Sequence, residues 1–399
     1  MSDYLYLLEN HLSAAQNKVA LLFAAAASAT DQTLYLTGGA VRDLLGGFPT
    51  RDLDFTLCGN PMKLNMSHIE EAGGLILRKD DVRKLMHFRF PEGVTAKIGM
   101  ARTERYNKPG AKPQIAPSDI REDLERRDFT VNAIGLGLTR SAKGMLADPA
   151  NGLADLGSRE MRTTNSGAFA SEPSRMARLI RFQHRLNFTI AERTLQQLQN
   201  ACDADLQRLI TPACWFEELC AWGNEAAPSV MLRDLEDRRI LSIPGCNYAS
   251  IQKWEKLKRG MPLAGTGWAD GWRSFYLAMT DGATAREKAG IAEGLGVTKE
   301  SQDTLKNLTL RARKLESAIV APSVKRPADL YLTMKAFAPD EILLALNTCG
   351  QRVVQDRLRN TLQKHFLVAA EMRGASEAEI VRRLNEKPKK PEEDPTLAE

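Results

Sequence analysis

Two aspartates, Asp52 and Asp54, stand two residues apart in the apolar segment RDLDFTLC. On a β-strand, residues i and i+2 point to the same face, so both carboxylates can reach one site. Upstream, Gly38-Gly39 precede a short segment of helical spacing that carries Arg42. The N–H groups at the start of a helix can bind a phosphate, and a guanidinium adds a fixed positive charge. Paired carboxylates beside a phosphate site predict Mg²⁺-assisted chemistry on a nucleotide.

Each part alone has a simpler explanation, because D-x-D pairs are common and Gly-Gly before a helix is often only a turn. The full order within Leu34–Phe55 is more specific: a strand, G-G-x-V-R-D, a breaker and an R-D-x-D-F strand. It resembles the head domain of the class II tRNA nucleotidyltransferase (CCA-adding enzyme) and bacterial poly(A) polymerase family, among the DNA polymerase beta-like nucleotidyltransferases. The resemblance implies that Asp52 and Asp54 are catalytic and hold two Mg²⁺ ions. It also implies that Gly38, Gly39 and Arg42 bind the triphosphate.

A second motif, RRDFTVNA, spans Arg126–Ala133. From the residues alone it is a basic pair beside polar side chains that can bind a sugar, or a capped helix start with surface arginines. It resembles the ribose-contacting motif of the same family. The resemblance implies that Asp128 and Asn132 hold the ribose, and that one of the arginines, here assigned as Arg127, contacts the phosphates.

Two further segments, which link the motifs, also resemble parts of this family. The segment Arg102–Asp119 is rich in proline and glycine, which predicts an extended, mobile loop. It resembles the flexible segment that the family uses in the switch to adding A. Asp148–Leu156, which reads DPANGLADL, resembles the family's hinge between head and neck.

The segment Ser171–Arg175 precedes a predicted helix that also carries Arg178. Glu172 and Arg175 are spaced i, i+3, so on a helix they would be neighbours on one face. Cytosine and adenine both present an amino donor beside a ring-nitrogen acceptor, which a carboxylate beside a guanidinium can match. A helix start with Ser171 as cap explains the same residues, and both interpretations can hold.

The chain departs from the family at two places. The usual base-reading motif is E-D-x-x-R, whereas Ser171 stands at the Glu position and Glu172 at the Asp position. Both Glu172 and Arg175, with Arg178, are still predicted to bind the nucleotide. Lys97 occupies a strand position where relatives often carry an acid. Metal binding would therefore depend on Asp52 and Asp54 together with substrate oxygens.

Composition restricts the class of protein. A chain of 399 residues suggests two to four domains, and 43% hydrophobic with 26% charged residues is typical of soluble globular proteins. The formal net charge of +5 permits a nucleic-acid partner without establishing one. Six scattered cysteines without a C-x-x-C pair suggest free thiols in a reducing compartment. The longest apolar stretch, 19–27, is too short for a membrane span, so we expect a cytoplasmic protein.

The pattern of elements predicts an α+β chain in which a mixed α/β head is followed by helices. Expected strands are Leu34–Thr37, Leu53–Leu57, Gly74–Leu77, His87–Phe90 and Thr95–Met100. From Glu172 onward long helical periodicity dominates, and the resemblance implies a helical neck, body and tail. The expected domains are a head at 1–160, a neck with base-reading and RNA-binding helices at 161–225, a body at 226–325, a tail at 326–385 and a disordered C-terminus at 386–399.

The resemblance implies a template-independent tRNA nucleotidyltransferase that adds C and A, or A alone, from CTP and ATP. Its partners would be the tRNA 3′ end, ATP and CTP, with no membrane and no obligate protein partner. A bacterial poly(A) polymerase on the same fold is the nearest alternative. A catalytically inactive RNA-binding relative is a further alternative, suggested by Lys97 and by the altered base-reading motif.

Overall fold

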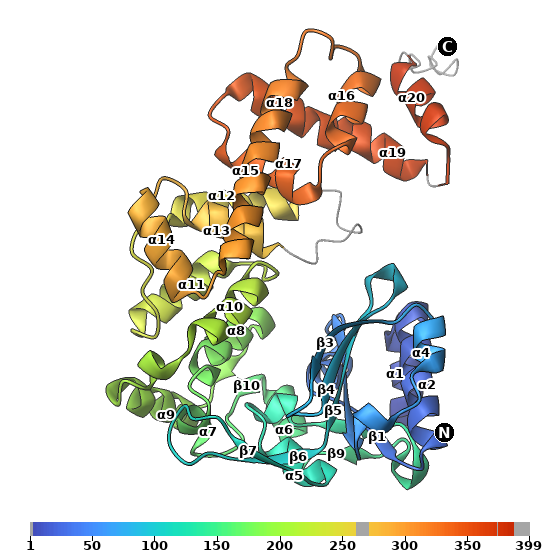
Figure 1. Cartoon of the computed structure of the whole chain (residues 1–399), viewed down its shortest axis with the longest axis vertical. Coiled ribbons are helices and arrows are strands. Elements are labelled where there is room, and N and C mark those ends of the chain that lie inside the picture. The colour runs from blue at the N-terminus through green and yellow to red at the C-terminus, as the bar shows by residue number, and fades with distance from the viewer. Residues whose placement is uncertain (1–2, 261–270, 373, 387–399) are drawn as a thin grey trace, which may run out of the picture. The chain divides into compact units, whose positions relative to one another are not determined.

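The computed structural model describes residues 3–260, 271–372 and 374–386, drawn in colour in Figure 1. The chain divides into two compact units. The first contains the residues up to 211 together with 234–241, and the second contains 212–233 and the chain from 242 onward. The predicted disordered C-terminus, apart from residue 386, lies outside the described residues.

A seven-stranded mixed sheet, in the order β3-β4-β5-β2-β1-β8-β9, forms the centre of the first unit. Its strands are β1 (Thr33–Thr37), β2 (Asp52–Cys58), β3 (Leu75–Asp80), β4 (Leu85–Arg89), β5 (Thr95–Met100), β8 (Gly135–Gly137) and β9 (Leu146–Ala147). The central pair β2 and β5 is parallel, and the other neighbouring strands are antiparallel. The acidic strand β2 therefore lies inside the sheet with a partner on each side.

The two faces of β2 have opposite chemistry. Leu53, Phe55 and Leu57 are buried on one face, where Phe55 lies 5.0 Å from the ring of Phe23 on α2 (Ala14–Ala29). The alternate residues of β2 point to the opposite face, as strand geometry requires. Because the core fixes the apolar face, it also determines the side on which the carboxylates stand.

Short helices complete the first unit (Figure 1). They are α1 (Asp3–His11), α2, α3 (Gly39–Gly46), α4 (Ser67–Glu71), α5 (Ile120–Glu125), α6 (Gly152–Ser158), α7 (Ala168–Ser171), α8 (Arg175–Leu186) and α9 (Glu192–Asp203), and a small parallel pair joins β10 (Glu160–Met161) to β11 (Thr189–Ile190). Ser13 forms a capping box at the start of α2, at the break expected near that residue.

The second unit is helical throughout its described residues. Its helices are α10 (Pro212–Trp222), the first part of α11 (Pro228–Asp237), α12 (Tyr248–Arg259), α13 (Trp272–Met279), α14 (Ala285–Gly294), α15 (Lys299–Ile319), α16 (Pro327–Lys335), α17 (Pro339–Thr348), α18 (Arg352–Asn360), α19 (Leu367–Glu371) and α20 (Glu377–Asn385). Ser376 and Glu379 form a capping box at the start of α20. The predicted α+β class and the change to helices are confirmed.

One prediction about local structure is wrong. The segment 102–119 is not simply an extended loop, because β6 (Arg102–Arg105) and β7 (Gln114–Pro117) pair as an antiparallel hairpin. Its two strands pair from Arg102↔Pro117 to Arg105↔Gln114, so the turn 106–113 and residues 118–119 lack strand structure. The prolines that suggested a loop lie at the end of β7 and in the turn, where a missing N–H costs little.

Candidate active site

The acidic pair stands on the open face of β2. Asp52 is exposed and Asp54 is partly buried, with Thr56 beyond them on the same face. The Oδ1 atom of Asp54 is buried and accepts no hydrogen bond from the described residues. Lys97 Nζ on β5 lies 3.5 Å from this atom. The structure thus brings Asp52 and Asp54 to one face as predicted, with a cation beside the second of them.

These two carboxylates can hold a divalent cation. A buried carboxylate oxygen without a hydrogen-bond donor is the kind of atom that a metal ion satisfies, and hard oxygen ligands suit Mg²⁺. Among the described residues, no group of three or more histidine, cysteine, aspartate or glutamate side chains is placed to hold a metal. An ion at Asp52 and Asp54 would therefore complete its shell with water and substrate oxygens.

The start of α3 faces the same site through a glycine. Gly38 has a φ of +67°, and a Cβ atom there would lie 3.0 Å from Arg127 Nη1 and 3.5 Å from Asp54 Oδ2. A side chain at this position would therefore be strained and would intrude between the guanidinium and the carboxylate. Gly39 follows as the first residue of α3, whose opening N–H groups can bind an anion.

Arg127 is the arginine that faces the acidic pair. Its Nη2 donates to the hydroxyls of Thr37 and Thr56, at 3.0 and 2.9 Å, and to Asp123 Oδ2 at 3.0 Å. These two threonines were not predicted from the sequence. Their signal was present, because Thr56 shares the face of Asp54 on β2 and Thr37 precedes Gly38.

Buried Asp123 binds the consecutive arginines Arg126 and Arg127 through different oxygens. Its Oδ2 accepts from Arg127, whereas its Oδ1 accepts from Arg126, whose Nε also donates to the carbonyl of Arg102 on the hairpin at 2.8 Å. Burial raises the pKa of Asp123, but Arg127 and Arg126 outweigh that effect and hold the pKa below its usual value. Arg127 therefore belongs to the site and Arg126 to the base of the hairpin.

The predicted ribose residues form one hydrogen-bonded chain. Asn132 Nδ2 donates to Asp128 Oδ1 at 3.1 Å, and Asn132 Oδ1 accepts from Arg42 Nη1 at 2.6 Å. Arg178 on α8 donates through Nε and Nη2 to Asp128 Oδ2, at 3.0 and 2.6 Å. The structure thus joins Asp128, Asn132 and Arg178, which the sequence placed in one nucleotide site.

Asp128 remains a carboxylate under all ordinary conditions. Burial alone would raise its pKa, but Arg178 and then Arg175, with hydrogen bonds from Arg178 and Asn132, hold the pKa far below its usual value. The site therefore offers a permanent acceptor, which suits the hydroxyl groups of a sugar.

Arg42 is not exposed, as a side chain that binds phosphate freely from solvent would be. Its side chain is 1% exposed, and Nε and Nη2 donate to Asp43 Oδ1 at 2.9 and 2.6 Å. Five consecutive residues of α3, from Ala40 to Leu44, are buried, so this part of the helix offers Arg42 no exposed face. In this geometry Arg42 acts on the site by holding Asn132.

Glu172 and Arg175 form the expected pair, but not on one helix. Arg175 Nε donates to Glu172 Oε2 at 3.1 Å. Helix α7 ends at Ser171, Glu172 has extended backbone angles, and α8 begins at Arg175 after Ser174. The predicted role of Ser171 as the cap of this helix, with Pro173 in its first turn, is therefore wrong. The turn across Glu172–Ser174 brings the two side chains together instead.

Burial differs strongly between the two members of this pair. The Arg175 side chain is 4% exposed, whereas the Glu172 side chain is 47% exposed. Arg175 Nη1 and Nη2 donate to the carbonyls of Arg127 and Arg126, at 3.2 and 2.8 Å. Glu172 can thus reach a ligand directly, while Arg175 ties it to the second motif.

The hairpin turn contacts the same region. Gly110 N donates to the carbonyl of Ala170 at 3.2 Å, and a Cβ atom on Gly110 would lie 3.7 Å from Pro173. Tyr106 Oη donates to Glu104 Oε2 at 2.8 Å. Burial, and next the charge of Glu104, raise the pKa of Tyr106, so it stays a neutral donor. The hairpin is therefore in contact with the residues that surround Glu172.

The segment expected to be a hinge forms the start of α6. Asp148 accepts from the N–H groups of Gly152 and Leu153, at 2.6 and 2.9 Å, and buried Asp155 accepts from Thr130 Oγ1 at 2.7 Å. A Cβ atom on Gly152 would lie 2.1 Å from the carbonyl of Thr130. Glycine is therefore required for this close approach to the second motif.

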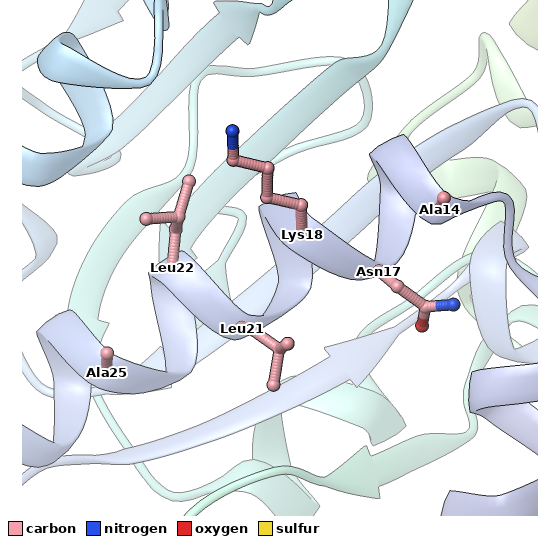
Figure 2. Close-up of a pocket in the computed structure, with 6 residues that line it drawn as sticks. All are labelled: Ala14, Asn17, Lys18, Leu21, Leu22 and Ala25. Carbon is pink, nitrogen blue, oxygen red and sulfur yellow. The ribbon is translucent and has the colours of Figure 1, made fainter.

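A separate shallow hollow lies on α2 and not at the acidic pair (Figure 2). Its lining residues are Ala14, Asn17, Lys18, Leu21, Leu22 and Ala25. Helix α2 packs through Phe23 on the apolar face of β2, opposite the carboxylates. This hollow carries no carboxylate, thiol or imidazole and lies outside the site.

Comparisons with known proteins find similarity in sequence to part of the chain. Residues 34–162 match the model of the poly A polymerase head domain. An A-adding tRNA nucleotidyltransferase of Halalkalibacterium halodurans is 30% identical over 238 residues, which cover 58% of this chain and 56% of that protein. A multifunctional CCA protein of Xylella fastidiosa is 35% identical over 221 residues, which cover 52% of this chain and 49% of that protein. The chain spans about half the length of these curated relatives.

Solved structures extend the likeness of fold to nearly the whole chain. A CCA-adding enzyme in an apo form has a TM-score of 0.59 at 21% identity, over 96% of this chain and 95% of that chain. A tRNA nucleotidyltransferase with a primer tRNA and an incoming ATP analogue has a TM-score of 0.55 at 22% identity, over 86% and 98%. None of the described helices is both long and apolar enough to cross a membrane.

Proposed function

We propose that the chain belongs to the tRNA nucleotidyltransferase and poly(A) polymerase family, whose head-domain model matches residues 34–162, and that it adds C and A, or A alone, to the 3′ end of tRNA. The nucleotide donors would be CTP and ATP, used without a template. The proposal places the protein in the cytoplasm, with tRNA as its macromolecular partner.

The observation that carries the proposal is a continuous run of polar contacts from the acidic strand to Glu172. Arg127 lies beside Gly38 and Asp54. Its carbonyl accepts from Arg175, which in turn binds Glu172. In this proposal the phosphates would lie at Arg127, the sugar at the next residue, Asp128, and the base at Glu172.

The residues would divide the reaction as follows. Asp52 and Asp54 would hold two Mg²⁺ ions, which lower the pKa of the RNA 3′-hydroxyl and stabilise the leaving pyrophosphate when bound. Arg127, Gly38 and Gly39 would bind the triphosphate oxygens and align the α-phosphate. The attack of the 3′-oxygen forms the new phosphodiester bond and breaks the α–β phosphoanhydride bond.

The remaining residues would select the nucleotide. Asp128 and Asn132 would accept from and donate to the ribose hydroxyls, and Arg178 and Arg42 keep both side chains in place. Glu172 would accept a hydrogen bond from the amino group of cytosine or adenine. Guanine and uracil present an oxygen at that position, so the carboxylate would face an acceptor and reject them.

The test supplies CTP and ATP separately to three tRNA substrates, which end before CC, before A or with the complete CCA. Addition of A alone to the second substrate supports an A-adding enzyme, and addition of C to the first supports CCA synthesis. Long A tracts on any RNA would instead indicate a poly(A) polymerase. Absence of incorporation on all three substrates, by folded protein, would contradict the proposal and favour an RNA-binding relative.

A further inference from the structure

Strand β5 gives each aspartate of β2 its own partner. The register of the parallel pair places Asp52 beside Thr95 and Asp54 beside Lys97. The Thr95 hydroxyl donates a hydrogen bond to Asp52 Oδ1, and Lys97 Nζ lies 3.5 Å from Asp54 Oδ1. A neutral donor therefore orients the first carboxylate, and a positive charge accompanies the second.

Lys97 is a charged group under the conditions in which the protein works. Its side chain is 43% exposed and its Nζ lies 3.5 Å from a carboxylate oxygen, so the ammonium keeps its ordinary charge at neutral pH. On the side of β5 away from β2, the strand register places Lys97 beside His87 on β4. It also places His87 beside Arg78 on β3. Burial and then Lys97 and Arg78 lower the pKa of His87, so it adds no positive charge at neutral pH.

These neighbours determine the net charge around Asp52 and Asp54. Two carboxylates with an ammonium at ion-pair distance carry a net charge of −1, where two unaccompanied carboxylates would carry −2. The ammonium also stands next to the buried Oδ1 atom of Asp54, which accepts no hydrogen bond from the described residues. A divalent ion that approaches this oxygen must first overcome the repulsion of Lys97.

We propose that Lys97 takes the place of a cation beside Asp54 in the nucleotide-free protein, so that the divalent ion is bound mainly together with the triphosphate. The triphosphate brings negative oxygens that both ligate the ion and attract Lys97, which can then turn away from Asp54. Lys97 is thus a positioning residue that makes metal binding depend on the nucleotide. The inference depends on the proposed function only in identifying the nucleotide as the second ligand.

The first experiment measures Mn²⁺ binding to the full chain without nucleotide, from the electron paramagnetic resonance signal of free Mn²⁺. Lys97→Met keeps most of the length of the unbranched side chain and removes its charge. This variant should bind Mn²⁺ at least roughly tenfold more tightly than the unsubstituted chain, because the repulsion is gone. Lys97→Arg, which keeps the charge, should bind as weakly as the unsubstituted chain. Equal affinity of Lys97→Met and the unsubstituted chain would overturn the inference.

Thr95→Val is the matched control on the same strand. It removes the hydrogen bond to Asp52 without changing any charge, so Mn²⁺ binding should not become tighter. If Thr95→Val tightens Mn²⁺ binding as much as Lys97→Met does, the effect comes from loosening β5 and the inference fails. Circular dichroism would establish that each variant is folded.

A second measurement needs no substitution. At an Mn²⁺ concentration that leaves the nucleotide-free chain mostly empty, a non-hydrolysable ATP analogue should raise the Mn²⁺ retained with the protein in equilibrium dialysis. Saturation of the unsubstituted chain with submillimolar Mn²⁺ and no nucleotide would overturn the inference even if Lys97→Met does not fold. Neither measurement uses tRNA or turnover, so their failure is distinct from a failure of nucleotidyl transfer.

Discussion

The carbonyl of Arg127 accepts two hydrogen bonds, from Thr164 Oγ1 at 2.6 Å and from Arg175 Nη1 at 3.2 Å. Arg175→Ala takes one of these donors away and also removes the donor to the carbonyl of Arg126. A buried carbonyl left without a partner costs about 1–3 kcal/mol, and the hydrogen bonds to these two carbonyls are partly buried. We therefore expect Arg175→Ala to lower the free energy of unfolding by about 1–3 kcal/mol, mainly through the carbonyl of Arg126.

The shared carbonyl makes a double-mutant cycle informative. Thr164→Val alone should cost less than about 1 kcal/mol, because Arg175 still donates to the carbonyl of Arg127. Removal of both donors leaves that carbonyl without either side-chain partner. The double variant should therefore be less stable than the sum of the single variants by about 1–2 kcal/mol.

The assay is urea unfolding of the four proteins, followed by circular dichroism and by the tryptophan fluorescence of the chain. Nucleotide choice is measured on the same proteins with each of the four nucleoside triphosphates. Arg175→Ala should lower incorporation of CTP and ATP and relax rejection of GTP and UTP, because Glu172 loses the group that orients it. Glu172→Gln is the control, and it should change selectivity with little change in stability because Glu172 is half exposed.

Two results would refute this reasoning. Additivity of Thr164→Val and Arg175→Ala within about 0.5 kcal/mol would show that the carbonyl of Arg127 does not couple them. Unchanged discrimination in both Arg175→Ala and Glu172→Gln would show that the base is selected elsewhere, and that the turn before α8 only starts a helix.

Two further predictions follow from the same contacts. Replacement of the hairpin turn 106–113 by a two-residue turn should reduce addition of A more than binding of ATP, because the contact of Gly110 with Ala170 is lost; equal losses in ATP binding, C addition and A addition would make the hairpin purely structural. Asp128 has a pKa held below its usual value in the folded protein, since Arg178 and Arg175 outweigh burial, so its contribution to stability is complete above about pH 5 and is lost as the pH falls. Asp128→Asn should therefore flatten the fall in the free energy of unfolding between about pH 5 and pH 2, and an unchanged profile would contradict the ion pair with Arg178.

The sequence predicted the acidic strand and its exposed face because the alternation from Asp52 to Leu57 is strict. A helix was also predicted after Glu172, and α8 runs from Arg175 to Leu186. Strand β8 was missed because its sequence Gly-Leu-Gly has neither alternation nor β-branched residues. It forms because buried Leu136 packs in the core of the sheet, a tertiary effect.

Contacts between residues far apart in the chain also could not be predicted from the sequence. The spacing of Glu172 and Arg175 predicted their contact. It placed both residues on one helix, whereas the helix before Arg175 ends one residue before Glu172. Arg42 was predicted as a phosphate ligand from its place after the glycines, whereas the fold turns it toward Asn132, 90 residues later in the chain. Lys97 beside Asp54 required the register of β5, which the sequence alone did not provide.

The most direct test of the proposed chemistry uses Asp54→Asn and Asp52→Asn, which keep the shape of each side chain and remove the charge that would hold the metal ions. Labelled ATP or CTP is supplied to tRNA lacking its terminal residues, with release of pyrophosphate measured in parallel. The account predicts incorporation with one pyrophosphate per residue for the unsubstituted chain. It predicts loss of both signals in each variant, with the circular dichroism spectrum unchanged. Substantial incorporation by both folded variants would contradict it.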